Sequence, residues 1–195
     1  MQAGTGDIEI RQVIGSDVQK LTVIGMLQLG VDYIFDDDFT EAMEDPDQFC
    51  LVATINGEPS GFAICREFGP EGERDELALP ESPERDWILS SRRIGLIDSV
   101  AISPDAGGRG IGRMLCNECL DVFRRDGCDS AVSMAWVHFD GVEPIRKALS
   151  SAGFERTPLQ IRGYWNQWVT SEGGHRCPYC GAPCDCFGAM WRKRL

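Results

Sequence analysis

The chain has 195 residues, of which 43% are hydrophobic, so it is long and apolar enough to form one domain with a sizeable core. Acidic residues outnumber Lys and Arg by 31 to 19, which leaves a formal net charge of −12. This balance argues against a dedicated nucleic-acid binder and against docking on an anionic membrane, because both need clustered cations. It favours neutral or cationic partners.

No segment is long enough to span a bilayer, since the most apolar stretch, residues 21–31, has about half the required length. The first ten residues lack the basic and apolar regions of a signal peptide. We therefore expect a cytoplasmic protein, in which the nine cysteines are buried thiols, metal ligands or redox groups rather than structural disulfides.

The first part of the sequence predicts a strand at residues 8–13, two helices and a β-hairpin. Ser16 and Gln19, three positions apart before an apolar run, predict a capping box that opens the first helix. An acidic loop at Asp36–Asp38 then leads into a short second helix. Asn56–Gly57 is a strong hairpin signal between two strands. The second helix and the hairpin strands are expected at residues 39–44, 50–55 and 60–66.

Residues 67–86 are rich in Pro, Gly and Glu and show no apolar period, so they predict a long mobile loop. The next segment, residues 94–103, is almost continuously apolar, which is typical of a strand buried on both faces. Asp140 and Glu143 predict the cap of a later helix that ends near residue 153. The remaining elements are a helix that ends near residue 125 and strands at 130–137 and 160–169. This order predicts a mixed α/β sheet with helices on both faces.

A turn with four glycines between residues 107 and 112 joins the strand at 94–103 to the helix that follows. Glycine lacks a Cβ, so backbone N–H groups in such a turn can approach an anion closely. The N-terminus of the helix adds free donors and a positive dipole, and two nearby arginines add charge. The pattern therefore predicts a diphosphate-binding turn.

The turn has three other possible interpretations. A Walker loop needs Lys and then Ser or Thr where Arg113–Met114 stand. A dinucleotide fingerprint needs Gly or Ala where Leu115 stands. A strand-to-helix turn that needs glycine for its geometry alone stays open.

The order of strand, Pro104–Asp105, glycine loop and helix resembles the acetyl-CoA loop of the GNAT superfamily of N-acetyltransferases. Gly153–Phe154 resembles that family's usual end of the second core helix, and the likeness covers about residues 8–169. It implies a GNAT-like central sheet and direct transfer of an acetyl group from acetyl-CoA to a primary amine in a ternary complex. The residues that it implies for acetyl-CoA binding are Val100, Ala101, Ile102, Gly107, Gly108, Arg109, Gly110, Ile111, Gly112 and Arg113.

The resemblance also implies how the thioester would be polarised, by backbone N–H groups near Ala101 and Ile102. Asp98, on the same apolar strand, is the candidate general base, because an ionisable group there is costly to bury unless it is paired or functional. The alternative is an aspartate bonded to Ser99 or to loop amides. Asp36–Asp38, where the family commonly contacts its acceptor, would favour a cationic amine, with a solvated acidic turn as the alternative.

Two positions depart from the family pattern. Gly107 stands where the loop usually opens with Arg or Gln, and Leu149 stands where a Tyr often protonates the leaving thiolate. Arg109 is then the substitute cation. Tyr164, expected on the last strand, is the candidate acid, although an aromatic on a strand usually serves packing. His138 is a second candidate, with a solvated loop residue as the alternative.

Composition shifts to Gly, Cys and Arg near residue 171, so we expect a main domain at residues 1–170 and a small Cys-rich module at 171–195. Four cysteines within ten residues match a closed tetrahedral site for a structural zinc ion. The expected ligands are Cys177, Cys180, Cys184 and Cys186, with His175 as a fifth candidate. An iron–sulfur cluster uses the same ligand set and stays open at this point.

Two functions follow from these observations. The first is an acetyl-CoA-dependent N-acetyltransferase with a structural zinc tail. The second is a catalytically weak CoA-binding protein that uses its zinc tail and acidic face to engage a protein partner. The aromatic final strand would offer an edge for a homodimer, and neither function involves nucleic acid or a membrane.

Overall fold

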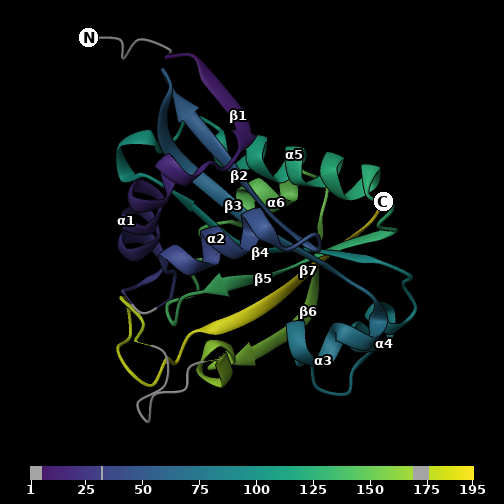
Figure 1. Ribbon diagram of the computed structural model, residues 1–195. Coiled ribbons are helices and arrows are strands. Elements are labelled where there is room, and N and C mark those ends of the chain that lie inside the picture. Colours follow the sequence, from purple (N-terminus) through teal and green to yellow (C-terminus); the bar gives the residue numbers. More distant parts are fainter. Residues whose placement is uncertain (1–5, 32, 169–175) are drawn as a thin grey trace.

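The computed structural model describes residues 6–31, 33–168 and 176–195. Seven strands of this part form one sheet in the order β1-β2-β3-β4-β5-β7-β6 (Figure 1). The strands are β1 Ile8–Gln12, β2 Gln48–Ile55, β3 Glu58–Phe68, β4 Ile94–Ile102, β5 Ser130–Val137, β6 Glu155–Arg162 and β7 Phe187–Arg194. Only β4 and β5 are parallel, and the other neighbours are antiparallel. The predicted mixed α/β sheet is confirmed.

Helices cover both faces of the sheet, as predicted. The helices are α1 Val18–Leu29, α2 Asp36–Glu44, α3 Glu73–Glu76, α4 Pro83–Leu89, α5 Ile111–Arg125 and α6 Arg146–Ser151. One face packs against α5 and α6. The other packs against α1 and α2 over β2 and β3, and against α3, α4 and the 3₁₀ helix η4 (Tyr164–Trp168) over β4, β5 and β7. None of the helices described here has the length and hydrophobicity needed to cross a membrane.

The predicted hairpin between β2 and β3 is confirmed. Asn56 and Gly57 both have positive φ, 52° and 84°, which is the backbone of a turn that matches the twist of the strands. The apolar run of β4 is buried at its first four positions, since helices lie on both faces there. Gly95 of β4 is needed because a Cβ at this position would lie 2.4 Å from the Phe123 ring of α5.

Two N-terminal predictions are wrong, and in both cases an aspartate is the reason. The capping box at Ser16 and Gln19 does not form. Instead the Asp17 carboxylate accepts the Ile14 N–H at 3.0 Å, at the start of a short 3₁₀ turn that precedes α1. The acidic segment Asp36–Asp38 is the first turn of α2 rather than a loop, because carboxylates stabilise a helix N-terminus.

The long loop predicted at residues 67–86 is also wrong. This segment holds the end of β3, a 3₁₀ turn, α3 and the start of α4. The Glu73 carboxylate is buried, binds Arg85 at 2.7 Å and accepts the Leu79 N–H at 2.8 Å. This segment is held by polar contacts of one buried carboxylate, which an apolar period does not reveal.

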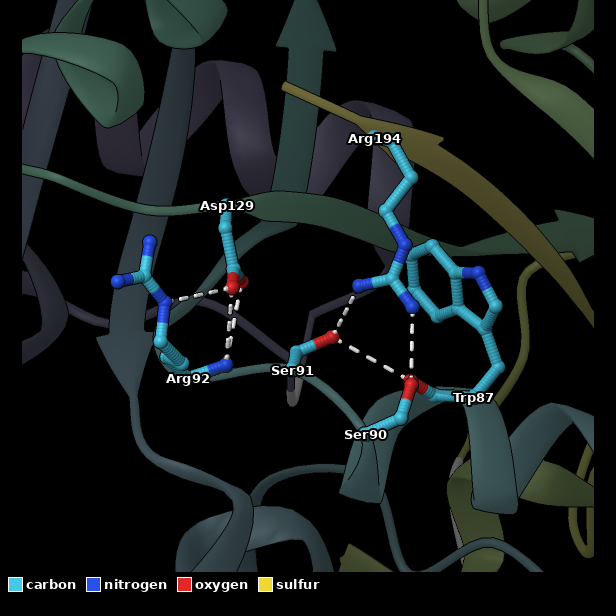
Figure 2. A network of polar contacts seen from close by, with 6 residues as sticks. All are labelled: Trp87, Ser90, Ser91, Arg92, Asp129 and Arg194. Carbon is cyan, nitrogen blue, oxygen red and sulfur yellow. Dashed lines mark hydrogen bonds and ion pairs between the residues drawn. The ribbon is translucent and has the colours of Figure 1, made fainter.

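The C-terminal end of β7 is joined to α4 by a polar network (Figure 2). The Arg194 guanidinium lies over the Trp87 ring, 4.2 Å from its centroid. It also donates to the hydroxyls of Ser91 and Ser90 at 2.7 and 2.9 Å. This contact fixes the α3–α4 segment against the sheet.

The C-terminal part differs from the prediction in three places. The helix expected from Asp140 is shorter, because the Glu143 carboxylate binds Arg156 and Trp191 instead of capping a helix. The strand expected at 160–169 is β6, which ends at Arg162, followed by η4. The last strand of the sheet is β7, which lies between β5 and β6. Residues 187–194 of the expected tail are therefore built into the main sheet.

Candidate functional site

The parallel pairing of β4 with β5 covers only three residue pairs and ends at Leu96 and Val132. On its other side β4 continues to pair with β3 as far as Ile102. The Ser103 N–H donates to the Ser60 carbonyl, so by the alternation of a strand the N–H groups of Val100 and Ile102 face away from β3. Beyond the point where β5 leaves it, this edge of β4 pairs with no described strand, and only its Ile97 carbonyl is engaged, by the Ser133 hydroxyl at 2.9 Å.

A cleft of about 570 Å³ lies along this free edge. The predicted segment Val100–Ile102 lines it, together with four glycines of the loop, Gly107, Gly108, Gly110 and Gly112. Arg113 and Lys147 add two cationic side chains to the lining. The cleft is thus positively charged near the glycines although the whole chain is acidic.

The glycine loop is shaped for a close approach to an anion. Gly108 and Gly110 have φ of 77° and 80°, and a Cβ at either would meet nothing within 4 Å. Gly110 is the N-cap of α5, so the first N–H groups of this 15-residue helix have no partner within the helix. Gly112 lines the cleft, and a Cβ there would lie 3.3 Å from Ile102 and 3.4 Å from Ala148. These features fit the diphosphate of a coenzyme.

Two of the predicted binding residues do not present their side chains to the cleft. Ile111 is 1% exposed and packs in the core beneath α5, and Arg109 is not among the lining residues.

Asp98 lies at an irregularity in β4. Ile64 and Cys65 of β3 pair with Ser99 and Ile97, so Asp98 is an extra residue without a partner, as in a β-bulge. The bulge directs the carboxylate into a small cavity of about 80 Å³, where the Ser99 hydroxyl donates to it at 3.2 Å. Burial raises the pKa of this carboxyl above the ordinary value of 3.8, and Arg66 and Ser99 oppose the shift.

The small cavity lies between two larger spaces and shares lining residues with each of them. It shares Val100, Trp136 and Ile145 with the 570 Å³ cleft. It shares Asp98 and Tyr33 with a third pocket of about 340 Å³ on the other side. Asp98 thus lines both the small cavity and the third pocket, and it does not line the large cleft itself.

The third pocket is acidic and aromatic. Among the described residues, its carboxylates are those of Asp38, Asp75, Glu76 and Asp98, and its one cation is Arg66, 3.9 Å from Glu76. Its rings come from Tyr33, Tyr164, Trp165 and Trp168. Of the acidic segment at the start of α2, only Asp38 lines this pocket.

The four cysteines of residues 176–186, the Cys-rich segment, lie close together. Their Sγ atoms all lie within 4.8 Å of one another, with close pairs at 3.5–3.8 Å. A tetrahedral zinc ion with Zn–S bonds of about 2.3 Å would separate its sulfurs by about 3.8 Å. The Cys177 and Cys180 sulfurs also accept the N–H groups of Tyr179 and Asp185 at 3.4 and 3.2 Å. The fifth candidate, His175, lies outside the described residues.

Residues 23–154 match the Acetyltransferase (GNAT) family. The chain belongs to this family. Among curated protein sequences, no match to the chain is found. The resemblance read from the glycine loop is thereby confirmed, and with it the class of enzyme, an acyltransferase.

Solved GNAT structures share the fold of the whole chain at low sequence identity. The Arabidopsis thaliana NAA60 structure with acetyl-CoA has a TM-score of 0.68 and 14% identity, and the alignment covers 97% of this chain and 99% of that one. NAA60 with a bisubstrate analogue has a TM-score of 0.66, 14% identity and coverage of 96% and 98%. The Drosophila melanogaster polyamine N-acetyltransferase has a TM-score of 0.62, 12% identity and coverage of 97% and 100%.

The structure shows where this GNAT chain places Leu149, one of its departures from the family pattern, and Tyr164, the candidate acid. Leu149 is fully buried in the core on the α5 face, so it offers no proton donor. Tyr164 belongs to η4 rather than to a strand, and its hydroxyl donates to the Leu77 carbonyl at 2.9 Å. Burial raises the pKa of Tyr164, which keeps it protonated, but this hydrogen bond directs its proton away from Asp98.

Sequence reasoning missed Tyr33 and the aromatic residues of the cleft. Tyr33 accepts a hydrogen bond from Trp165 at 3.0 Å and lines the cavity of Asp98. The signal for it was its position between α1 and α2, where the GNAT family contacts its acceptor. Trp136 and Tyr179 line the large cleft beside His138, the second candidate acid, although Tyr179 comes from the Cys-rich segment. No local pattern reveals that contact.

Proposed function

We propose that this GNAT protein transfers an acetyl group from acetyl-CoA to a primary amine by direct attack in a ternary complex. The observation that supports this most is the row of three adjoining spaces: Asp98 lines the small cavity and the acidic pocket, and the small cavity shares Val100 and Trp136 with the large cleft. The glycine-lined cleft would hold the donor and the acidic pocket the acceptor, with the small cavity between them. Both substrates would have to be bound together for the reacting atoms to meet, as direct transfer requires.

The donor is held by backbone groups and two cations. N–H groups of the glycine loop and of the first turn of α5 bind the diphosphate, and Arg113 and Lys147 neutralise its charge. The free N–H groups of Val100 and Ile102 bind the pantetheine arm and the acyl carbonyl, as an added strand would. Acetyl-CoA supplies the activated acyl group as a thioester.

Asp98 is the general base in this proposal. Its raised pKa brings it closer to the working pH, as a proton acceptor requires. It removes one proton from the ammonium form of the acceptor, directly or through water. The nitrogen then forms a C–N bond as the C–S bond breaks, and the second amine proton ends on the departing sulfur. The proton balance is thus one to Asp98 and one to the thiol.

A tyrosine hydroxyl is proposed to deliver the second proton to the departing sulfur. Tyr164 was predicted for this role, but its hydrogen bond to the Leu77 carbonyl does not support it. Tyr33 lines the same cavity as Asp98, and burial raises its pKa, so it stays protonated. Tyr33 is therefore the better-placed hydroxyl.

The acceptor is proposed to be a cationic amine. Four carboxylates and one guanidinium leave the third pocket with a net negative charge, and its aromatic rings suit a cation and its carbon chain. Two solved proteins of similar fold are an agmatine N-acetyltransferase and a polyamine N-acetyltransferase, which agrees with such a substrate.

The Cys-rich segment is proposed to hold a structural zinc ion. Four thiolates leave no open position for a substrate, so the ion has no catalytic step to perform. Sulfur atoms that all lie within 4.8 Å suit one ion rather than a cluster, in which several irons separate the thiolates. We expect one zinc per chain and a colourless protein, and visible charge-transfer absorption would contradict zinc.

An assay of thiol release tests the proposed function. Acetyl-CoA is incubated with a panel of diamines, arylalkylamines, peptides with free N-termini and neutral amines, and the rate is compared with that of Asp98→Asn. Turnover of cationic amines that this variant loses is expected. Tight binding of acetyl-CoA without turnover of any amine would favour the rival, an interaction module. The cytoplasmic location and the homodimer stay predictions.

A further inference from the structure

The Cys-rich segment reaches the cofactor cleft through one aromatic side chain. Tyr179 lies between Cys177 and Cys180 in sequence, and its ring stacks on His138 at the end of β5, with centroids 3.8 Å apart and planes 29° apart. Trp136 of β5 meets both rings edge-on, at 4.6 Å from His138 and 5.2 Å from Tyr179. All three rings line the 570 Å³ cleft.

Tyr179 is only partly covered by this stack. His138 is 3% exposed beneath it, whereas Tyr179 is 56% exposed. Its ring therefore has free surface at the cleft, on the β5 side, across from the free edge of β4. An aromatic ring in this position can pack against the pantetheine arm of a bound coenzyme, because the arm must pass between the two strands.

The position of Tyr179 depends on the four thiols. Its N–H donates to the Cys177 sulfur at 3.4 Å, and the turn that carries it is closed by two backbone hydrogen bonds between Cys177 and Gly181, each 3.0 Å. Asn166 of η4 bonds both backbone groups of Cys184, which ties the other side of the thiol cluster to the main domain. One metal ion would join these parts.

We propose that Tyr179, stacked on His138, is a wall of the acetyl-CoA site, and that the metal bound by the four cysteines holds this wall in place. This rests on the proposed function. The metal would then control the affinity for acetyl-CoA without touching either substrate. Loss or oxidation of the thiolates would weaken cofactor binding, which makes the segment a metal-dependent regulator of the enzyme.

The first test is calorimetric titration of acetyl-CoA into the full-length, zinc-loaded chain. Tyr179→Ala is expected to raise Kd about tenfold, the scale of one lost aromatic contact. Tyr179→Phe keeps the ring and should stay within about twofold of the wild type. Phe139→Ala is the matched control, because Phe139 is 60% exposed, follows His138 and does not line the cleft. An unchanged Kd for Tyr179→Ala overturns the proposal.

The second test removes the metal with a chelator and repeats the titration. In the wild type, metal removal should raise the Kd for acetyl-CoA about as much as Tyr179→Ala does. In the Tyr179→Ala variant, metal removal should raise the Kd less than twofold further, because both changes disturb the same contact. Equal and independent losses would overturn the coupling. Should circular dichroism show that the stripped protein loses its fold, the zinc-loaded Tyr179→Ala variant decides. A purified chain without bound metal overturns the metal's part.

The outcomes separate this inference from the proposed function. A zinc-loaded wild type that does not bind acetyl-CoA at all would contradict the enzyme itself. If acetyl-CoA binding and turnover are unchanged both by Tyr179→Ala and by metal removal, the proposed enzyme stands and only the proposed role of Tyr179 and the metal is overturned.

Discussion

Asp98 combines a strand irregularity with burial, and this combination makes its role testable. We expect Asp98→Asn to lower kcat by about 10²–10⁴-fold, as for other general bases, with the Kd for acetyl-CoA within about twofold of the wild type. Steady-state kinetics and calorimetry measure the two quantities. Asp105→Asn is the control, because Asp105 is exposed beside the glycine loop and does not line the cleft. Equal loss of kcat in both variants would remove Asp98 from the mechanism.

The raised pKa of Asp98 also predicts a pH dependence of stability. The folded chain holds this proton at a pH where the unfolded chain, with an ordinary value of 3.8, has released it. The contribution of Asp98 to the free energy of unfolding therefore falls as pH rises from about 3.8 through the pKa of the folded state, and it stays low at higher pH. Asp98→Asn removes the penalty, so its Tm at pH 7.5 should equal or exceed that of the wild type. A clearly lower Tm would show that the carboxylate supports the fold.

Glu76 provides a residue-level test of the acceptor pocket. Burial raises its pKa, with Arg66 opposing the shift, yet it contributes negative charge where the acceptor is proposed to lie. Glu76→Gln should raise KM for a diamine by up to about fivefold, the scale of one partly exposed ion pair. KM for an amine with no second cationic group should stay unchanged. Glu44→Gln, on the exposed face of α2, is the control. An equal rise for both amines would contradict charge selection.

The site residues that could be predicted are those that stand out from their immediate neighbours in the sequence. Asp98 stood out as a charge in an apolar strand, and the glycines by their spacing. Tyr33 and Tyr179 did not stand out, because their places in the site come from packing between segments far apart in the chain.

Among the elements, the α3–α4 segment depends on one buried carboxylate. Glu73→Ala would leave the Leu79 N–H without its acceptor, which costs about 1–3 kcal/mol for a buried donor. We expect the Tm to fall by about 2–10 °C in a melt followed by circular dichroism. The neighbouring Glu71 is exposed, so Glu71→Ala is the control. Equal melting of both variants would show that the segment is held by its apolar contacts alone.

The elements that were predicted have strong local signals, and the others do not. β4 and α5 were recognised because an apolar run and an amphipathic period extend over 9 and 15 residues. α3 has four residues and α4 has seven, too few for a period to emerge. β7 was hidden because its sequence follows the Cys-rich segment, and its pairing with β5 and β6 is a long-range contact.

For the whole molecule, binding of acetyl-CoA should appear as a thermal shift. A ligand at one hundred times its Kd adds about 2.7 kcal/mol to the stability of the state that binds it. For a chain of this size that corresponds to a rise in Tm of about 5–10 °C. Free adenosine diphosphate should give a smaller rise and acetate none. A Tm that does not respond to acetyl-CoA would contradict the proposed cleft.

The overall architecture could be predicted because the order of strands and helices restricts a mixed sheet to few arrangements. The place of the last strand could not, since β7 enters between β5 and β6 rather than at an edge. That choice depends on which edges remain open after the rest of the sheet has formed.

The position of β7 has a consequence for synthesis on the ribosome. Until residues 187–194 have left the exit tunnel, β6 has no neighbour and β5 presents a bare backbone on that side. Premature termination before this stretch would therefore leave an incomplete sheet whose exposed strand edges can pair with other chains. Quality-control proteases would be expected to clear such nascent fragments quickly.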